Sequence, residues 1–188
     1  MKSLMMIVTG LFLGFNLYAQ EINEEQLGNM SRKERKEYKK QLNLEQQREL
    51  IQTLNSREWV LEAYMLQNKY GESVNIQPSL NFVAMTGDVA TVQLGSSHLI
   101  GPNGVGGITL EGNVRQYEIN ENNKPGSGAY VNLSISGVSS GYLTLYVHAS
   151  ADGTARATVM DNFGNKLTYQ GKIVPADESI VYKGQVVY

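Results

Sequence analysis

From residue 58 onward, apolar and polar residues alternate in short runs separated by turn-forming residues. The run 129–136 places alanine, valine, leucine and isoleucine at every second position, and the run 142–149 repeats this pattern. A period of two residues is typical of a β-strand with one buried face. The turns between these runs, such as 151–153, are too short for a crossover connection. The alternation therefore predicts an antiparallel meander.

A meander of about eight to ten strands must bury its apolar face, either by closing as a barrel or by folding over as a sandwich. The sequence leaves both alternatives open for this β-rich domain, which we assign to residues 57–188. Gly87-Asp88 lies between two apolar runs and predicts a two-residue hairpin. Beyond Ile108 the apolar residues change parity, which indicates a β-bulge, and we expect the kink at Gly112.

Residues 31–56 are predicted to form one N-terminal α-helix. No glycine or proline occurs between residues 31 and 54, and Ser31 with Glu34 has the spacing of a capping box. The apolar stripe widens toward Leu50 and Leu54. We therefore expect the last turns of the helix to pack on the β-rich domain, while its basic beginning is solvated.

The first residues have the layout of a secretory signal peptide. Lys2 precedes an uncharged, mostly apolar run, and Ala19 offers a small residue at the expected cleavage point. The apolar run is shorter than the roughly 20 residues that a membrane-spanning helix needs. We assign residues 1–19 to a signal peptide and residues 20–30 to a flexible linker. After cleavage, no transmembrane span is expected.

The glycine-rich segment 98–112 is the first candidate ligand-binding element. A phosphate-binding loop would need a lysine after its last glycine and a following helix, and this segment has neither. Its backbone amides can still form an anion-binding nest, or its glycines can simply supply the conformation of a turn. The candidate ligand-binding residues are Gly101, Asn103, Gly104, Gly106 and Gly107.

The second candidate element is the polar face of the run 142–149, which carries Tyr142, Tyr146 and His148. Tyrosine rings on an exposed sheet face suit a sugar, a peptide or a partner protein. The same rings also suit packing against another structural element. We therefore name Tyr142, Tyr146 and His148 as candidate ligand-binding residues.

No residue pattern predicts catalysis, a metal site or a cofactor. The two histidines, His98 and His148, do not have metal-ligand spacing, and the chain contains no cysteine. No nucleophile elbow occurs. Carboxylates such as Asp88, Glu111 and Glu118 fall at strand or turn positions where solvated side chains are expected. The formal net charge of −2 does not favour nucleic-acid binding.

Several segments together resemble an uncharacterised family, domain of unknown function 4251. The most specific are "NFVAMTGDVATVQ" and "GPNGVGGITLEG", supported by "SREWVLEA" and the closing "KLTYQGKIVPADESIVYKG". The resemblance covers nearly the whole chain after the signal peptide. It implies an exported protein of a Bacteroidetes-type, Gram-negative bacterium. It implies no activity, cofactor or catalytic residue.

These observations favour an exported protein that is periplasmic, outer-membrane-associated or secreted. The leading functional hypothesis is a non-enzymatic binding or envelope-associated protein that holds a small apolar or glycan ligand, or an envelope protein. One alternative is a hydrolase acting on envelope or dietary polymers. Another is a protein-interaction or inhibitor module that uses a sheet edge.

Overall fold

A computed structural model describes residues 30–96, 102–121, 124, 126–138 and 141–186. Among these residues, the helix α3 (Arg32–Ser56) comes first and is followed by strands alone, apart from two short 3-10 turns, η1 (Pro78–Leu80) and η2 (Ala176–Glu178). The strands are β1 (Glu58–Asn68), β2 (Ser73–Asn75), β3 (Phe82–Thr86), β4 (Val89–Leu94), β5 (Ile108–Glu121), β6 (Ala129–Val138), β7 (Gly141–Ala149), β8 (Thr154–Asp161) and β9 (Lys166–Pro175). None of the helices in this part of the chain is long and apolar enough to cross a membrane.

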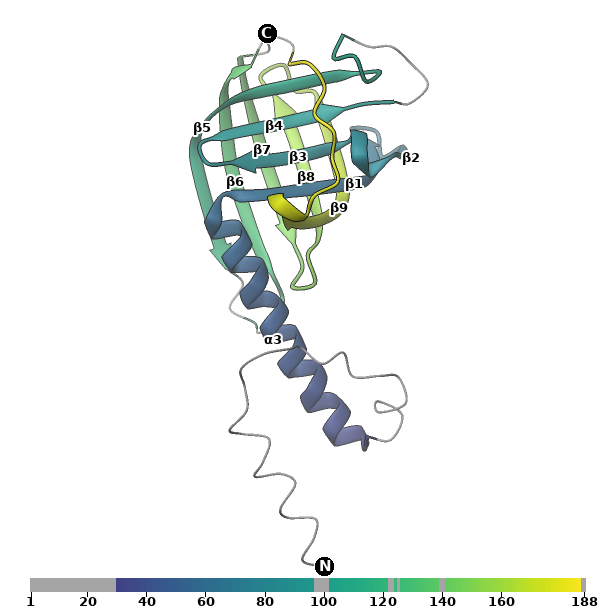
Figure 1. Cartoon of the computed structure of the whole chain (residues 1–188), viewed down its shortest axis with the longest axis vertical. Coiled ribbons are helices and arrows are strands. Elements are labelled where there is room, and N and C mark those ends of the chain that lie inside the picture. Colours follow the sequence, from purple (N-terminus) through teal and green to yellow (C-terminus); the bar gives the residue numbers. More distant parts are fainter. Residues whose placement is uncertain (1–29, 97–101, 122–123, 125, 139–140, 187–188) are drawn as a thin grey trace, which may run out of the picture. The chain divides into compact units, whose positions relative to one another are not determined.

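The strands form one antiparallel sheet that closes on itself. Within the described residues, its order is β2-β1-β3-β4-β5-β6-β7-β8-β9, and β1 also pairs with β9. The eight strands β1 and β3 to β9 therefore make a closed barrel, with β2 added beside the far end of β1 (Figure 1). The predicted antiparallel meander is confirmed. Of the two alternatives that the sequence left open, the structure has the barrel and not the sandwich. Closure pairs both edges of the meander, which an open sheet would leave free.

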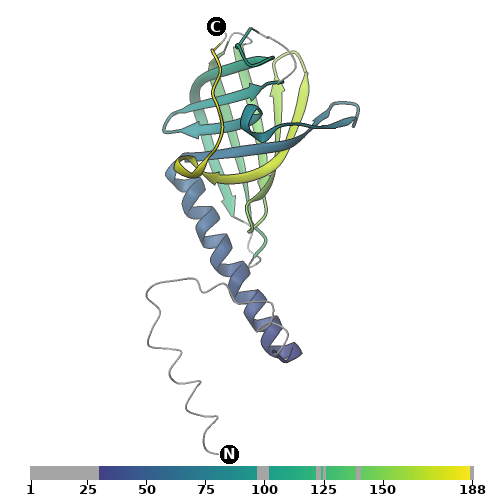
Figure 2. The ribbon, with the colours of Figure 1, turned by 45° about the vertical axis from the view of Figure 1, so that its right-hand side comes forward.

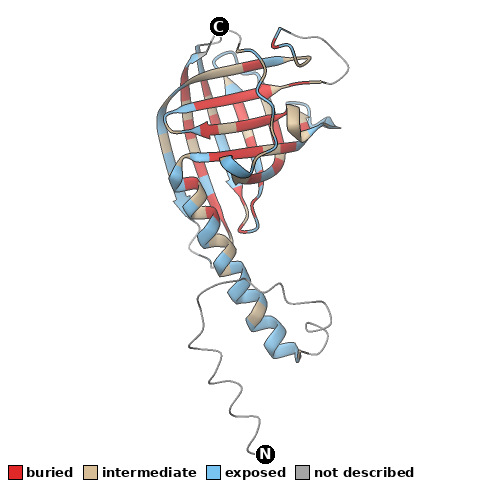
Figure 3. Ribbon diagram, viewed as in Figure 1, coloured by how far each residue is buried: buried red, intermediate tan, exposed pale blue. Residues whose placement is uncertain are grey.

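Inward-facing residues of the barrel strands form a buried core, against which partly buried residues of β5 pack. Figure 3 colours the buried residues red. An eight-stranded barrel has an interior just wide enough for side chains to fill. The buried strand residues of this core are Trp59, Leu61, Ala63, Leu66, Val83, Met85, Ala90, Val92, Ala129, Val131, Leu133, Ile135, Leu143, Leu145, Val147, Ala149, Ala155, Ala157, Val159, Tyr169 and Ile173. The inward-facing runs predicted for β6 and β7 are confirmed.

The C-terminal turns of α3 cover one end of the barrel (Figure 2). Leu50 and Leu54 are buried and belong to the same core as the strands. The Nε1 of Trp59 donates a hydrogen bond to the hydroxyl of Tyr117 at 2.9 Å, and that hydroxyl donates to the carbonyl oxygen of Leu54 at 2.7 Å. The prediction that the last helical turns pack on the β-rich domain is confirmed.

The capping box at the beginning of α3 is also present. The backbone N–H of Ser31 donates to Oε2 of Glu34 at 2.8 Å, and the backbone N–H of Glu34 donates to Oγ of Ser31 at 3.3 Å. Hydrogen bonds to the Glu34 carboxylate from the side chain and the backbone N–H of Ser31 lower the pKa of Glu34. The two bonds of the capping box also satisfy two of the N–H groups that the first helical turn leaves without partners.

The bulge in β5 lies three residues beyond the position expected from the sequence. The register with β6 shifts between Val114 and Gln116, so Arg115 is the additional residue. Its Nε donates a hydrogen bond to Oγ of Ser136 at 2.6 Å. Gly112 instead permits a close approach between strands, because a Cβ there would lie 2.3 Å from the carbonyl oxygen of Ser136. The expected kink at Gly112 was therefore wrong, although a bulge does cause the change of parity.

Candidate functional site

Two surfaces on the outside of the barrel are candidate sites. The first, which we call the aromatic face, consists of Tyr130 on β6 and Tyr142, Tyr146 and His148 on β7. The three tyrosines are 46%, 56% and 51% exposed, respectively, and His148 is also exposed. Tyr130 lies opposite His148 in the strand register, and their ring centroids are 4.6 Å apart. The structure therefore brings the three predicted residues of β7 together with a fourth aromatic side chain.

The residues that separate these rings are polar but uncharged. Asn132 lies opposite Tyr146, and Ser134 lies opposite Thr144. Charged residues occur on the adjoining strands, where Arg156 of β8 lies opposite His148 and Glu118 of β5 lies opposite Asn132. The aromatic face thus combines flat rings with amide and hydroxyl groups, which can donate and accept hydrogen bonds without a net charge.

Asn103 explains the conformation of the glycine-rich loop. This buried side chain accepts hydrogen bonds at Oδ1 from the backbone N–H groups of Val105, at 3.1 Å, and Gly107, at 2.9 Å. Its Nδ2 donates to the carbonyl oxygen of Leu94 at 3.2 Å and to Oγ1 of Thr109 at 3.1 Å. Two amides that an anion-binding nest would need are therefore already engaged by Asn103.

The glycines of this loop meet steric requirements. Gly104 and Gly106 have φ values of 77° and 76°, a conformation that favours glycine. A Cβ at Gly107 would lie 2.0 Å from the carbonyl oxygen of Leu94. Gly101 and His98 lie outside the described residues. The structure gives the described part of the loop a structural role, and the prediction that the loop binds a ligand stays a prediction.

The second candidate site is a pocket beneath the C-terminal segment. Residues 176–186, which we call the strap, run across the outside of β1, β3 and β4 (Figure 1). The carboxylate oxygen Oε1 of Glu62 accepts hydrogen bonds from Oγ of Ser179 at 2.7 Å and from the N–H of Ile180 at 2.9 Å. Further along, Nε2 of Gln93 donates to the carbonyl oxygen of Tyr182 at 2.8 Å. These bonds fix the strap to the barrel wall.

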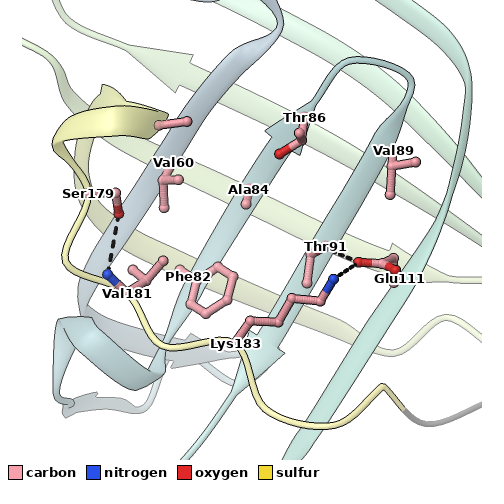
Figure 4. A pocket seen from close by; sticks show the side chains of 11 residues that line it. Val60, Phe82, Ala84, Thr86, Val89, Thr91, Glu111, Ser179, Val181 and Lys183 are labelled. Atoms are coloured by element: carbon pink, nitrogen blue, oxygen red, sulfur yellow. Dashed lines mark hydrogen bonds and ion pairs between the residues drawn. The ribbon is translucent and has the colours of Figure 1, made fainter.

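The space between the strap and the wall, which we call the strap pocket, has a volume of about 400 Å³. Its floor is one outward-facing row in which Val60, Ala84, Thr91 and Glu111 lie side by side on β1, β3, β4 and β5. Phe82 adds a buried ring to the floor, and Val181 and Lys183 of the strap form the opposite wall (Figure 4). Apolar residues therefore line one end and polar groups the other.

Glu111 and Lys183 form an ion pair at the polar end of the strap pocket (Figure 4). Oε2 of Glu111 also accepts a hydrogen bond from Oγ1 of Thr91 at 3.0 Å. Partial burial raises the pKa of Glu111, but the hydrogen bonds from Lys183 and Thr91 and the positive charge of Lys183 outweigh this effect. The net result is a pKa below the ordinary value, which keeps Glu111 ionised.

The other carboxylates named from the sequence also have polar partners. Asp88 forms an ion pair with Arg57, and Oε1 of Glu118 accepts a hydrogen bond from Nε2 of Gln116 at 2.9 Å. Within the described part of the chain, no three histidine, aspartate or glutamate side chains are placed to hold a metal ion together.

The strap pocket was not predicted from the sequence, and neither was the inclusion of Tyr130 in the aromatic face. One signal for the pocket was present. The run Phe82-Val83-Ala84-Met85 is apolar at every position, which indicates a strand buried on both faces. Tyr130 joins the aromatic face only through the register of β6 with β7.

The fold and the two surfaces define a class of protein: a closed antiparallel β-barrel with a helix over one end and a C-terminal strap across its outer wall. The chain belongs to the DUF4251 family, a domain of unknown function, whose family model matches residues 41–173. A solved structure of a DUF4251 family protein from Bacteroides eggerthii is similar, with a TM-score of 0.56 and 24% sequence identity. The match covers 74% of this chain and 94% of that protein. No curated protein matches the chain.

Proposed function

We propose that this protein is exported and binds a neutral glycan on the aromatic face, without catalysing a reaction on it. The observation that carries the proposal is the grouping of Tyr130, Tyr142, Tyr146 and His148 on the exposed side of two paired strands. A cluster of exposed aromatic side chains marks an interaction surface more often than a single exposed aromatic residue does.

The chemistry of the aromatic face favours a sugar chain as its ligand. Rings can stack on the apolar faces of sugars, while Asn132, Ser134 and Thr144 can bond to hydroxyl groups. The absence of charge at these outward positions of β6 and β7 argues against a charged polymer. Tyr142 and Tyr146 are four residues apart on one strand, a separation of roughly 14 Å, which suits an extended chain better than a single sugar.

Support for export comes from the N-terminal sequence. Residues 1–19 have the charge, the apolar run and the small residue of a signal peptide. The resemblance described in the sequence analysis implies an envelope or secreted location. A protein that binds glycans on a rigid outer face would meet its ligand in either place.

Affinity electrophoresis tests the proposal. The purified protein is run in native gels that contain starch, xylan or dextran, and its mobility is compared with that in a gel without polysaccharide. We expect at least one polysaccharide to retard the protein. The rings supply the contact area. The double substitution Tyr142→Ala and Tyr146→Ala is therefore expected to weaken the retardation, with an apparent affinity for the polysaccharide at least tenfold lower.

Tyr70→Ala provides the matched control, because Tyr70 is also an exposed tyrosine but lies in the turn between β1 and β2. This variant is expected to be retarded like the unaltered protein. Equal retardation of all three proteins, or no retardation by any of the polysaccharides, would contradict glycan binding on the aromatic face. Retention of a co-purifying protein that the double substitution abolishes would instead point to a protein partner.

A further inference from the structure

The strap pocket is unusual because outward-facing positions of a barrel strand carry apolar residues. Val60 and Phe82 point away from the core and are nevertheless buried, because the strap covers them. Outward positions on a barrel in water are ordinarily polar. Beside these residues remains a space of about 400 Å³ with the Glu111 carboxylate at its polar end. This size lies within the range of small-molecule sites.

The groups around the strap pocket are predominantly acidic. Among the described residues, the carboxylates that line it or lie within two residues of its lining are Glu58, Glu62, Asp88, Glu111, Asp177 and Glu178. Among the same described residues, Lys183 is the one positively charged residue that lines the strap pocket or lies within two residues of its lining. Two of these carboxylates have a cation beside them: Asp88 is paired with Arg57, and Glu62 lies opposite Lys172. An acidic excess of this kind attracts cations and repels anions.

We propose that the strap pocket is a binding site for a small organic cation with an apolar body, such as an alkylamine. The ammonium group of the ligand binds the carboxylate of Glu111. The apolar body lies on Val60, Phe82 and Ala84, beneath the strap. This site is separate from the aromatic face and does not depend on the function proposed for it.

Lys183 shows that an ammonium group fits beside Glu111. Its Nζ already bonds to Oε2 of Glu111, while Oε1 accepts no hydrogen bond from the described residues. The side chains of Lys183 and Glu111 are 47% and 25% exposed, so Lys183 can turn into solvent more easily than Glu111 can. A ligand ammonium therefore binds at Oε1 or replaces that of Lys183.

The first experiment compares two probes that differ only in the charge of the head group. Octylamine and octanoate are titrated separately into the purified protein, and binding is followed by the NMR shifts of backbone amides. Octylamine is expected to bind at least tenfold more tightly, with shifts at Thr91, Glu111 and Val181. Equal affinities, shifts confined to other residues, or no binding of octylamine would overturn the proposal.

Two substitutions break the same ion pair but predict opposite results. Glu111→Gln removes the carboxylate and is expected to weaken octylamine binding at least tenfold. Lys183→Ala removes the competing ammonium and is expected to leave octylamine binding unchanged or to strengthen it several-fold. If the ion pair only held the strap in place, both variants would change the affinity in the same direction, and that result would also overturn the proposal.

A second pair of variants tests the location of the apolar body. Ala84→Trp fills the floor of the strap pocket and is expected to abolish binding of octylamine. Thr144→Trp places the same side chain on the outer face of β7, four strands away around the barrel, and is expected to leave binding unchanged. Unimpaired binding by the Ala84→Trp protein would place the amine elsewhere and contradict the assignment.

Discussion

The hydroxyl group of Tyr117 joins the helix to the barrel by accepting a hydrogen bond from Nε1 of Trp59 and donating one to the carbonyl oxygen of Leu54. Leu54 and Trp59 belong to the consecutive elements α3 and β1, whereas Tyr117 lies on β5, 58 residues beyond Trp59. Burial raises the pKa of Tyr117, although the hydrogen bond from Trp59 and the charge of Arg57 oppose this shift. Tyr117 therefore remains a neutral donor at physiological pH.

Tyr117→Phe is expected to lower the free energy of unfolding by about 1–3 kcal/mol, because it leaves the buried indole N–H of Trp59 without its partner and removes one of the two hydrogen bonds that the Leu54 carbonyl oxygen accepts. Urea unfolding followed by tryptophan fluorescence measures this change, since Trp59 is the single tryptophan. Tyr142→Phe, at an exposed tyrosine, serves as the control and is expected to stay within about 0.5 kcal/mol of the unaltered protein. Equal stability of all three proteins would mean that the Tyr117 bonds contribute nothing.

The C-terminal turns of α3 are expected to be part of the cooperative folding unit. Leu54 is fully buried, so Leu54→Ala should lower the free energy of unfolding by about 2–5 kcal/mol. Leu42→Ala changes the same residue type at an exposed position of the same helix and should cost less than about 1 kcal/mol. Thermal unfolding followed by circular dichroism compares them. Similar losses at both positions would contradict the packing described for α3.

Asn103 is expected to contribute strongly to stability. Asn103→Ala removes the hydrogen bonds that this side chain makes to two backbone amides, to the Leu94 carbonyl oxygen and to the Thr109 hydroxyl, which keeps only its bond to Gln93. We therefore expect a loss of about 2–4 kcal/mol in the free energy of unfolding. Asn132→Ala removes the same side chain from the outer face of β6 and is expected to change stability by about 0.5 kcal/mol or less. Urea unfolding of the two variants measures the difference, and equal values would show that the Asn103 bonds are not needed.

The ion pair of Glu111 and Lys183 predicts a dependence of stability on pH. The pKa of Glu111 is lower in the folded protein than in the unfolded chain, so its ionisation stabilises the fold above the ordinary glutamate pKa. This contribution is lost as the pH falls through the lowered folded value. The difference in stability between the unaltered protein and Glu111→Gln should therefore shrink between roughly pH 6 and about pH 3.

Urea unfolding at a series of pH values measures that difference directly. Other acidic groups with lowered pKa values, including Asp161, titrate in both proteins and cancel in the comparison. A difference that stays constant or grows toward low pH would contradict the assigned shift of Glu111.

The sequence predicted the elements that depend on neighbouring residues. Alternation of residue type indicates which side of a strand each residue faces, so the inward rows of β6 and β7 were predicted correctly. The capping box at Ser31 and the hairpin at Gly87-Asp88 are similarly local, because each needs only a few consecutive residues. These features require no information about distant parts of the chain.

Only the tertiary structure decided which distant residues become neighbours. The pairing of β1 with β9 closes the sheet as a barrel instead of a sandwich. The register of β6 with β7 places Tyr130 on the aromatic face. The strap pocket depends on contacts such as that between Glu62 and Ser179, which are 117 residues apart. A period of two residues specifies the side of a strand but not its partner across a closing sheet. For this reason the sequence alone predicted the strands, and the tertiary structure positioned both candidate sites.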